Sequence, residues 1–237
     1  MTQQRISFGL PPIRTAAAKL AVALVAGSLI FAVALHEWVL LVPKLIIGQH
    51  AYWQFFTYAF VETTPMGVIF GAIILWSIGG SLEQTWGARR LLTFALGVTV
   101  AAGLLTFVAG WIYSPIFGTG FAGGNVMTSA LWVAFGLSWG QRQTNFWGLP
   151  VTGNVLALIG VGFVVLNAAF GNPMVVIPDV FALLITFAFV RYGFPERTFE
   201  RFNSWRLRRQ LARRRAHLDV VSGQKRNMPT DSDRFLH

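Results

Sequence analysis

Residues 91–141 read LLTFALGVTVAAGLLTFVAGWIYSPIFGTGFAGGNVMTSALWVAFGLSWGQ, and this stretch decides the class of fold. It contains no Asp, Glu, Lys or Arg, and it is long enough for two membrane helices of about 20 residues each. Across all 237 residues, 54% are apolar and 12% are charged, whereas soluble domains carry roughly 25% charged residues. The composition excludes an ordinary soluble enzyme and a disordered protein, and it predicts a polytopic membrane protein.

The apolar stretches are continuous and lack the alternation of a membrane barrel, so we expect helices. The predicted fold is an all-α bundle of six membrane helices, with a long, aromatic-rich outer loop over about 43–65. The predicted organisation is a segment over 1–15, a membrane domain over 16–191 and a basic tail over 192–237. The six expected spans cover about 16–42, 66–82, 90–112, 120–139, 149–168 and 173–191.

Basic residues predict the orientation, because cytoplasmic loops are enriched in Lys and Arg. All the predicted loops on one side carry Arg or Lys, and the other side offers only Lys44. Both termini are therefore expected in the cytoplasm. The tail holds many of the basic residues, and a helix over 197–216 would suit anionic lipid head groups. Nucleic acid is not an expected partner; RNA binding by RLRRQLARRR is an alternative with little specific support.

The chain has no cysteine, which excludes disulfides, thiolate zinc sites and a cysteine nucleophile. No cofactor or metal is expected. His36 and Glu37 could join Asp179 as metal ligands only if both pointed to the same side of a helix. Adjacent residues of a helix point to different sides, so such a site is not expected. A transporter or channel is disfavoured, because the spans hold almost no polar residues to line a pathway.

Residues 46–91 read IIGQHAYWQFFTYAFVETTPMGVIFGAIILWSIGGSLEQTWGARRL. This segment resembles the rhomboid family of intramembrane serine proteases. Trp53-Gln54 stands at the family's Trp-Arg position. Gly79-Gly80, Glu83 and Gly87 match the end of its second span, and GFAGG at 120–124 resembles the Gly-x-Ser-Gly opening of its fourth. The resemblance covers about 16–191 and implies the rhomboid fold, with Trp53, Glu83 and Gly87 as structural positions.

The same resemblance implies that the catalytic groups are missing. Rhomboids use a Ser–His dyad with His and Asn as oxyanion donors. Here Ala122 stands at the nucleophile, Asp179 at the base, Gly67 at the oxyanion His and Gly71 at the oxyanion Asn. A hydroxyl nucleophile needs an adjacent base, so the resemblance indicates a pseudoprotease that does not cleave peptide bonds.

Two functions follow as alternatives. The first is a non-catalytic membrane protein that binds the transmembrane segments of single-span clients, in a cleft formed by Gly71, Ala122, Gly123 and Asp179. The second is an active intramembrane protease that uses other residues. Ser129, or Ser114 with His50, would be the groups for that alternative, although their spacing does not favour it.

Asp179 has two interpretations. A carboxylate within a span indicates a functional site, because its burial in hydrocarbon is costly. It also follows Pro178 at the expected start of the last span, where a carboxylate stabilises the positive end of a helix. The sequence leaves both roles open, a structural cap and a polar contact for a client.

Overall fold

The computed structural model describes residues 14–33, 36–146 and 149–193. The chain divides into two compact units, residues 1–192 and 193–237. The second unit, beyond Gly193, lies outside the described residues, and so does the basic helix expected over 197–216. All that follows concerns the first unit.

The prediction of helical membrane spans is confirmed for four helices, which are long and apolar enough to cross a bilayer. Two further helices occupy the predicted positions of the fourth and sixth spans, but each has only 16 residues. The four long helices are α1 (Ala16–Val33), α5 (Pro65–Trp86), α6 (Ala88–Gly110) and α8 (Gly153–Phe170), and the two shorter ones are α7 (Gly124–Trp139) and α9 (Ile177–Tyr192).

The first predicted span, 16–42, is wrong in its second half. Helix α1 ends at Val33, and a separate short helix, α2 (His36–Val39), follows the two undescribed residues. Leu41 is instead extended and exchanges both backbone hydrogen bonds with Phe121, each over 3.0 Å. Val42 is also extended (φ −117°, ψ 101°), as expected for a residue before proline.

The fifth predicted span, 149–168, begins too early. Residues Leu149–Thr152 form strand β2, which pairs in antiparallel fashion with β1 (Gln143–Phe146). Helix α8 starts only after this hairpin, at Gly153. A composition-based reading cannot separate a short apolar strand from the first turn of a helix, which explains both the early start and the missed hairpin.

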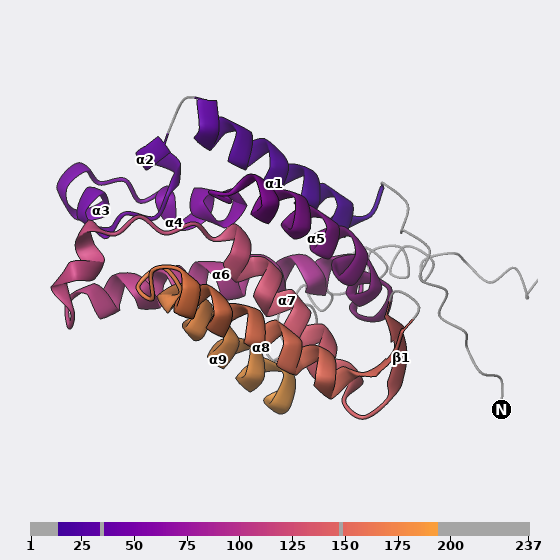
Figure 1. Ribbon diagram of the computed structural model, residues 1–237. Helices are drawn as coiled ribbons and strands as arrows, with labels where there is room; N and C mark the ends of the chain where they lie inside the picture. The colour runs from indigo at the N-terminus through magenta and orange to yellow at the C-terminus, as the bar shows by residue number, and fades with distance from the viewer. Residues whose placement is uncertain (1–13, 34–35, 147–148, 194–237) are drawn as a thin grey trace, which may run out of the picture. The chain divides into compact units, whose positions relative to one another are not determined.

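Short helices fill the segment that the sequence analysis treated as an outer loop. They gather with α2 at one end of the bundle, opposite the β-hairpin, and we call this the loop end (Figure 1). A small apolar cluster of Leu41, Ile46, Tyr58, Ile116 and Phe121 holds this end together. The short helices of this segment are α3 (Pro43–Gln49), α4 (Gln54–Thr57) and η1 (Tyr58–Phe60), and η2 (Ser114–Gly118) joins them from the connection between α6 and α7.

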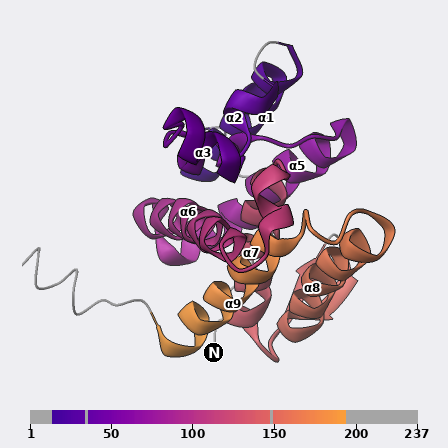
Figure 2. The same cartoon turned by 90° about the vertical axis from the view of Figure 1, so that its left-hand side faces the viewer.

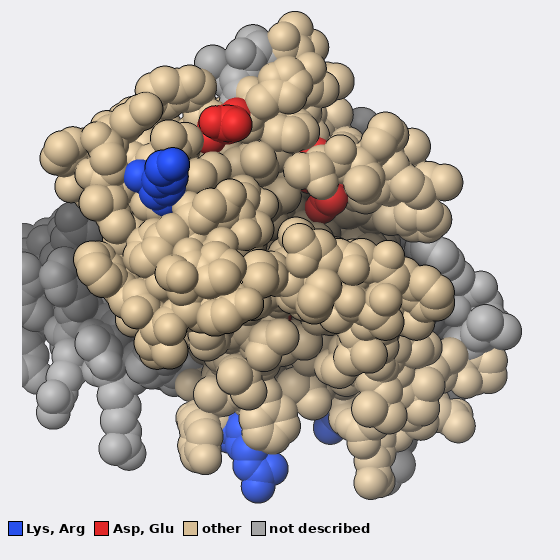
Figure 3. Space-filling view, turned by 60° about the vertical axis from the view of Figure 1, so that its left-hand side comes forward, with Lys and Arg blue, Asp and Glu red and all other residues tan. Residues whose placement is uncertain are grey.

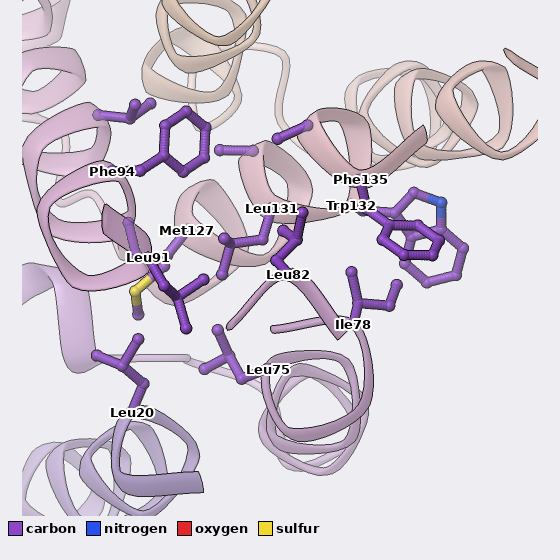
Figure 4. Packing of buried hydrophobic residues seen from close by; sticks show 14 of the residues in the cluster. Leu20, Leu75, Ile78, Leu82, Leu91, Phe94, Met127, Leu131, Trp132 and Phe135 are labelled. Atoms are coloured by element: carbon purple, nitrogen blue, oxygen red, sulfur yellow. The ribbon is translucent and has the colours of Figure 1, made fainter. Parts of the chain in front are cut away.

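Helix α7 is the centre of the bundle. It packs against α5, α6, α8 and α9, which surround it in the view along the bundle (Figure 2). Every residue from Val126 to Gly136 is buried. Figure 4 shows Met127 and Leu131 among core side chains from α1, α5 and α6, such as Leu20, Leu75 and Leu91. Helix α1 packs mainly on α5, away from this centre.

The outward surface of the bundle is apolar. Figure 3 shows one face on which Lys, Arg, Asp and Glu are few and scattered among uncharged residues. Large apolar side chains point outward along α5, α6 and α8, including Phe70, Val108 and Phe163, each at least half exposed. Such a surface suits lipid, in which apolar side chains need no partner from the protein.

Glu83 and Gly87 have structural roles at the hairpin end. The Glu83 carboxylate accepts the backbone N–H groups of Ala16 (3.0 Å) and Ala17 (2.9 Å), so α5 caps the start of α1. Gly87 separates α5 from α6 with a φ of +83°, a backbone conformation that glycine adopts without a steric penalty. The sequence placed Glu83 in a structural role; that its partner is α1 comes from the structure.

Replacing Glu83 with alanine should lower the stability of the α1–α5 pair. Two N–H groups at the start of α1 would lose their acceptor, and the loss of a helix cap costs about 1–2 kcal/mol. Thermal unfolding of the purified protein in detergent should show a lower Tm for Glu83→Ala. Glu37→Ala removes an exposed carboxylate at the loop end and serves as the control, with a Tm close to that of the unmodified chain. Equal Tm values for the two variants would contradict the capping role.

Candidate functional site

The four positions that the sequence resemblance aligns with rhomboid catalytic groups lie on or next to α5, α7 and α9. Gly67 and Gly71 occupy the first two turns of α5, Ala122 precedes Gly123, the N-cap of α7, and Asp179 lies in the first turn of α9. Gly71 and Asp179 are buried, and Ala122 and Gly67 are half-buried. They therefore lie near the loop end of the bundle, mostly out of contact with the surroundings.

Residues 58–62, which we call the cap segment, cover the start of α7. The N–H of Gly123 donates to the Tyr58 carbonyl over 2.8 Å, and the N–H of Gly124 donates to the Val61 carbonyl over 2.9 Å. The backbone N–H of Asn125 hydrogen-bonds to the Glu62 carboxylate. The N–H groups at a helix start have no partner within the helix, and here another part of the chain supplies three acceptors.

The cap segment is itself firmly anchored. Tyr58 is fully buried, and its hydroxyl donates to the Thr99 carbonyl in α6. The N–H of Glu62 donates to Oγ of Ser28 in α1 over 2.9 Å. Ser28 in turn donates to the Leu24 carbonyl over 2.7 Å. The cap segment thus connects α1, α6 and α7 at the loop end.

Side chains fill the space beside the two glycines of α5. A Cβ on Gly67 would lie 2.6 Å from Cγ of Glu62, and a Cβ on Gly71 would lie 2.9 Å from Cδ2 of Leu24. These distances are shorter than normal contacts, so the imidazole or amide that a rhomboid carries at these positions would require a shift of Glu62 or Leu24. A larger residue at either position would therefore have to displace these side chains.

Asp179 is the buried polar group of the site. Its Oδ1 accepts a hydrogen bond from Nδ2 of Asn125 (3.0 Å) and lies 3.2 Å from Oγ of Ser129. Ser129 also lies within hydrogen-bonding distance of the Val126 carbonyl, at 3.1 Å. The side chain of Asp179 therefore points across to α7, although it sits in the first turn of α9. Its bonded partners are neutral, and no histidine takes part.

Asn125 was not predicted from the sequence, and Ser129 was named only as a group for the protease alternative. Both residues lie on α7, one turn apart, and the structure joins them to Asp179. The signal was the spacing of the two polar residues in an otherwise apolar helix, because residues four apart share a helix face. Asn125 and Ser129 of α7 both donate to the carboxylate of Asp179 in α9, and these hydrogen bonds hold the two helices together.

Glu62 lies at the junction of the cap segment with α5, outside the long helices, and is half-buried. Burial raises the pKa of the Glu62 carboxyl, and hydrogen bonds from the backbone of Thr63, Thr64 and Asn125 offset part of this effect. The net shift is upward, because desolvation of the charged form is the largest cause. Glu62 was not among the site residues predicted from the sequence.

At the Trp-Arg position, Gln54 is the buried residue and Trp53 is half exposed. Gln54 donates from Nε2 to the Glu37 carbonyl and accepts the Val42 N–H at Oε1, both over 3.0 Å. Trp53 stacks on Trp38 with ring centroids 6.0 Å apart and donates to the Trp38 carbonyl over 3.2 Å. The pair connects α4 to α2 and to the start of α3, which is a structural role.

The alternative groups for catalysis do not form a dyad in the described part of the chain. Ser114 begins η2 and is exposed, and His50 ends α3 with its ring against Tyr52, 5.9 Å between centroids. No hydrogen bond joins Ser114 to His50 there. Within the described ranges, no three His, Cys, Asp or Glu side chains gather as metal ligands would.

A comparison with known protein families gives one match that covers most of the chain. The family model described as "Eukaryotic integral membrane protein (DUF1751)" matches residues 18–198. The match begins in the first turn of α1 and extends past the end of α9. It therefore includes the whole bundle with the cap segment and the buried Asp179.

Gly123→Ala should destabilise the contact between the cap segment and α7. The new Cβ would lie 2.7 Å from ring carbons of Tyr58 and 2.9 Å from its carbonyl oxygen. Such overpacking costs about 1–3 kcal/mol, so we expect a lower Tm in detergent and faster proteolysis after Tyr58 or Phe60.

Gly118→Ala is the matched control, because no atom lies within 4 Å of its added Cβ. A Tm for Gly123→Ala as high as that of Gly118→Ala would show that the cap segment does not press on Gly123.

Proposed function

The chain belongs to the family described as "Eukaryotic integral membrane protein (DUF1751)", and we propose that it is a rhomboid-like pseudoprotease that binds transmembrane segments of client proteins. The proposal combines the family's membrane location with the rhomboid resemblance of residues 16–191. The client is a single membrane helix, and the binding site is the loop-end half of the bundle around α7.

One observation carries the non-catalytic part of the proposal. The N–H groups of Gly123 and Gly124, which follow the nucleophile position, already donate to the Tyr58 and Val61 carbonyls. Oxyanion stabilisation requires free donors aimed at the reacting oxygen. Ala122 has no nucleophilic atom, and Asp179 is engaged by Asn125 and Ser129. Nucleophile, base and oxyanion donors are therefore all without their catalytic function.

We further propose six spans with both termini in the cytoplasm. The 16 residues of α7 or α9 extend about 24 Å, short of a hydrocarbon core of about 30 Å, a mismatch that local thinning of the bilayer accommodates. The basic residues support the orientation. Arg14, Lys19, Arg89, Arg90, Arg142 and Arg191 flank the hairpin ends of their helices, and Lys44 lies at the loop end.

Reporter fusions test this topology. Fusions at residues 48, 115 and 172 should report the external side, and fusions at 86, 144 and 220 should report the cytoplasm. Excess Lys and Arg remain on the cytoplasmic side during insertion, which is the reason for the expectation. Opposite results at two or more positions would overturn both the six-span arrangement and the rhomboid alignment.

The apolar faces of α5 and α8 support binding of a helix as client. Both helices pack on α7, and both expose large apolar side chains toward the loop end, for example Ile69 and Phe70 on α5 and Leu166 on α8. A membrane helix that approaches α7 from the side of α5 and α8 would meet these side chains. Association in lipid depends on close packing of side chains, which such a surface provides.

Site-specific photocrosslinking tests client binding. A photoreactive amino acid at Phe70 on α5 should crosslink to apolar, membrane-spanning segments of other proteins in native membranes. The same amino acid at Leu105 on α6 is the matched control, since Leu105 is similarly exposed, at 40% against 50%. We expect client crosslinks at position 70 and lipid adducts alone at position 105. Equal crosslinks at both positions, or none, would contradict client binding.

The protease alternative is tested with the same purified protein. A fluorophosphonate probe should leave it unlabelled, and a generic transmembrane substrate should remain uncleaved. Ala122→Ser should also label weakly or not at all, because Asp179, at the position aligned with the base, is bonded to Asn125 and Ser129 and a hydroxyl nucleophile needs an adjacent base. Labelling and cleavage by the unmodified chain would overturn the pseudoprotease proposal and favour the protease alternative.

A further inference from the structure

We propose that residues 54–60, which comprise α4 and η1, form a re-entrant segment that lies inside the bilayer at the loop end, with Phe56 in contact with lipid acyl chains. The partner of this surface is the lipid of one leaflet. The proposal requires only that α1 and α6 span the membrane. It holds for either orientation of the chain and without a client, so it can fail while the client proposal stands, and the reverse also holds.

The contact of Phe60 with α1 gives the depth of the segment. A Cβ on Gly27 would lie 2.9 Å from Cβ of Phe60, so these two residues stand at the same level. Gly27 is six residues before Val33, where α1 ends, and six residues rise about 9 Å along a helix. The 18 residues of α1 extend about 27 Å, less than a hydrocarbon core of about 30 Å. Phe60 therefore lies well within the span of α1.

Contacts with α6 give the same result. The Tyr58 hydroxyl donates to the Thr99 carbonyl. Thr99 is eleven residues before Gly110, the end of α6, which corresponds to about 16 Å along the helix. The ring of Phe55 meets that of Phe107 edge to face, with 5.7 Å between centroids, three residues before the same end. Two long helices thus place this segment at membrane depth.

The chain enters and leaves this depth from the same end. It arrives from α2 and α3, which follow the end of α1, and it continues into α5. Gly71 of α5 faces α1, since an added Cβ would lie 2.9 Å from Cδ2 of Leu24. Pro65, the first residue of α5, is six residues before Gly71 and so stands about 9 Å nearer the loop end than Leu24. Phe60, level with Gly27, stands only three residues from Leu24, so the chain rises again before α5 begins.

The backbone of the segment is suited to this depth. The bilayer core has no water, so irregular backbone is tolerated there only where the protein supplies its partners. The N–H groups of Phe56 and Thr57 donate to the Trp53 carbonyl over 2.9 and 3.0 Å. Tyr58 is fully buried, and its carbonyl accepts the N–H of Gly123. These groups need no water, so the segment can lie in hydrocarbon.

Phe56 is the side chain that this arrangement leaves to lipid. It is 55% exposed, and its ring lies beside that of Phe60, with 6.4 Å between centroids. Because Phe60 is level with Gly27, Phe56 points outward at the depth of the acyl chains. On α1, Ile30 is exposed to a similar extent, 49%, midway between Gly27 and Val33. Acyl chains can cover both side chains, since neither needs a polar partner.

Polar and aromatic residues of α2, α3 and the start of α4 mark the surface of the bilayer. Glu37 on α2 and Lys44 on α3 are exposed, and their charges require water or head groups. Trp38 and Trp53 stack on each other, and both are nearly half exposed. Tryptophan is enriched at membrane–water interfaces. The order of charged residue, tryptophan and Phe56 therefore follows the change from water to hydrocarbon.

Spin labelling of the chain in liposomes tests the position of Phe56. The chain has no cysteine, so Phe56→Cys, Ile30→Cys and Gln49→Cys each provide a single labelling site. Oxygen concentrates in the hydrocarbon, whereas a nickel chelate stays in the water that the bilayer core excludes. Ile30→Cys is the matched lipid reference, with a similar exposed fraction, and Gln49→Cys is the reference for an exposed polar position on α3.

We expect the ratio of oxygen to nickel collisions at residue 56 to match that of Ile30→Cys and to exceed that of Gln49→Cys several-fold. A ratio as low as that of Gln49→Cys would place the segment in water and overturn the proposal. Low collision rates with both reagents would show that a second copy of the chain, and not lipid, covers residue 56. That result would overturn the proposal as well.

A second measurement uses the unmodified chain. A phosphatidylcholine with a photoreactive group in the middle of an acyl chain should form adducts on residues 54–60. The same lipid with the group on its head should form adducts at Trp38 and Trp53. Residues 126–136 of α7 are all buried and serve as the control, which should remain unlabelled. Adducts on residues 54–60 from the head-group probe alone, or from neither probe, would overturn the re-entrant position.

Discussion

The start of α7 imposes the constraint on which the loop end of this protein depends. A helix that begins inside an apolar bundle has N–H groups that neither water nor the helix itself can satisfy. The Tyr58 and Val61 carbonyls and the Glu62 carboxylate accept three of them. Because Tyr58 is bonded to α6 and Glu62 to α1, the partners of α7 also hold its neighbours in place. The position of the central helix is thus set at its first turn.

Under the proposed rhomboid alignment, structural contacts stand at the positions where the family has its catalytic groups. Internal acceptors occupy the N–H groups of Gly123 and Gly124. The side chains of Glu62 and Leu24 fill the space beside Gly67 and Gly71. Residue 122 is an alanine without a hydroxyl, and Asp179 binds Asn125 and Ser129 across the α7–α9 contact.

The sequence predicted the helices whose apolar stretches are long, since length and hydropathy determine whether a segment spans a membrane. It did not predict where the chain becomes extended at Leu41, because that depends on pairing with Phe121, 80 residues away. It missed the hairpin for another reason, because composition does not separate a short apolar strand from the first turn of a helix. It identified Asp179 from its charge, and the spacing of Asn125 and Ser129 on one face of α7 was a local signal that was overlooked. The roles of Gln54 and Glu62 depend on burial and on backbone partners from other elements, and no local pattern carries that information.

The carboxylate of Glu83 has a consequence for the way in which the chain is made. It accepts the N–H groups of Ala16 and Ala17, which are synthesised more than 60 residues earlier. While the ribosome is still producing the intervening segment, these two N–H groups have only water or lipid head groups as partners. They acquire their protein acceptor when the far end of α5 has emerged. Translation therefore delivers α1 to the membrane before its cap, and the two helices reach their final state as a pair.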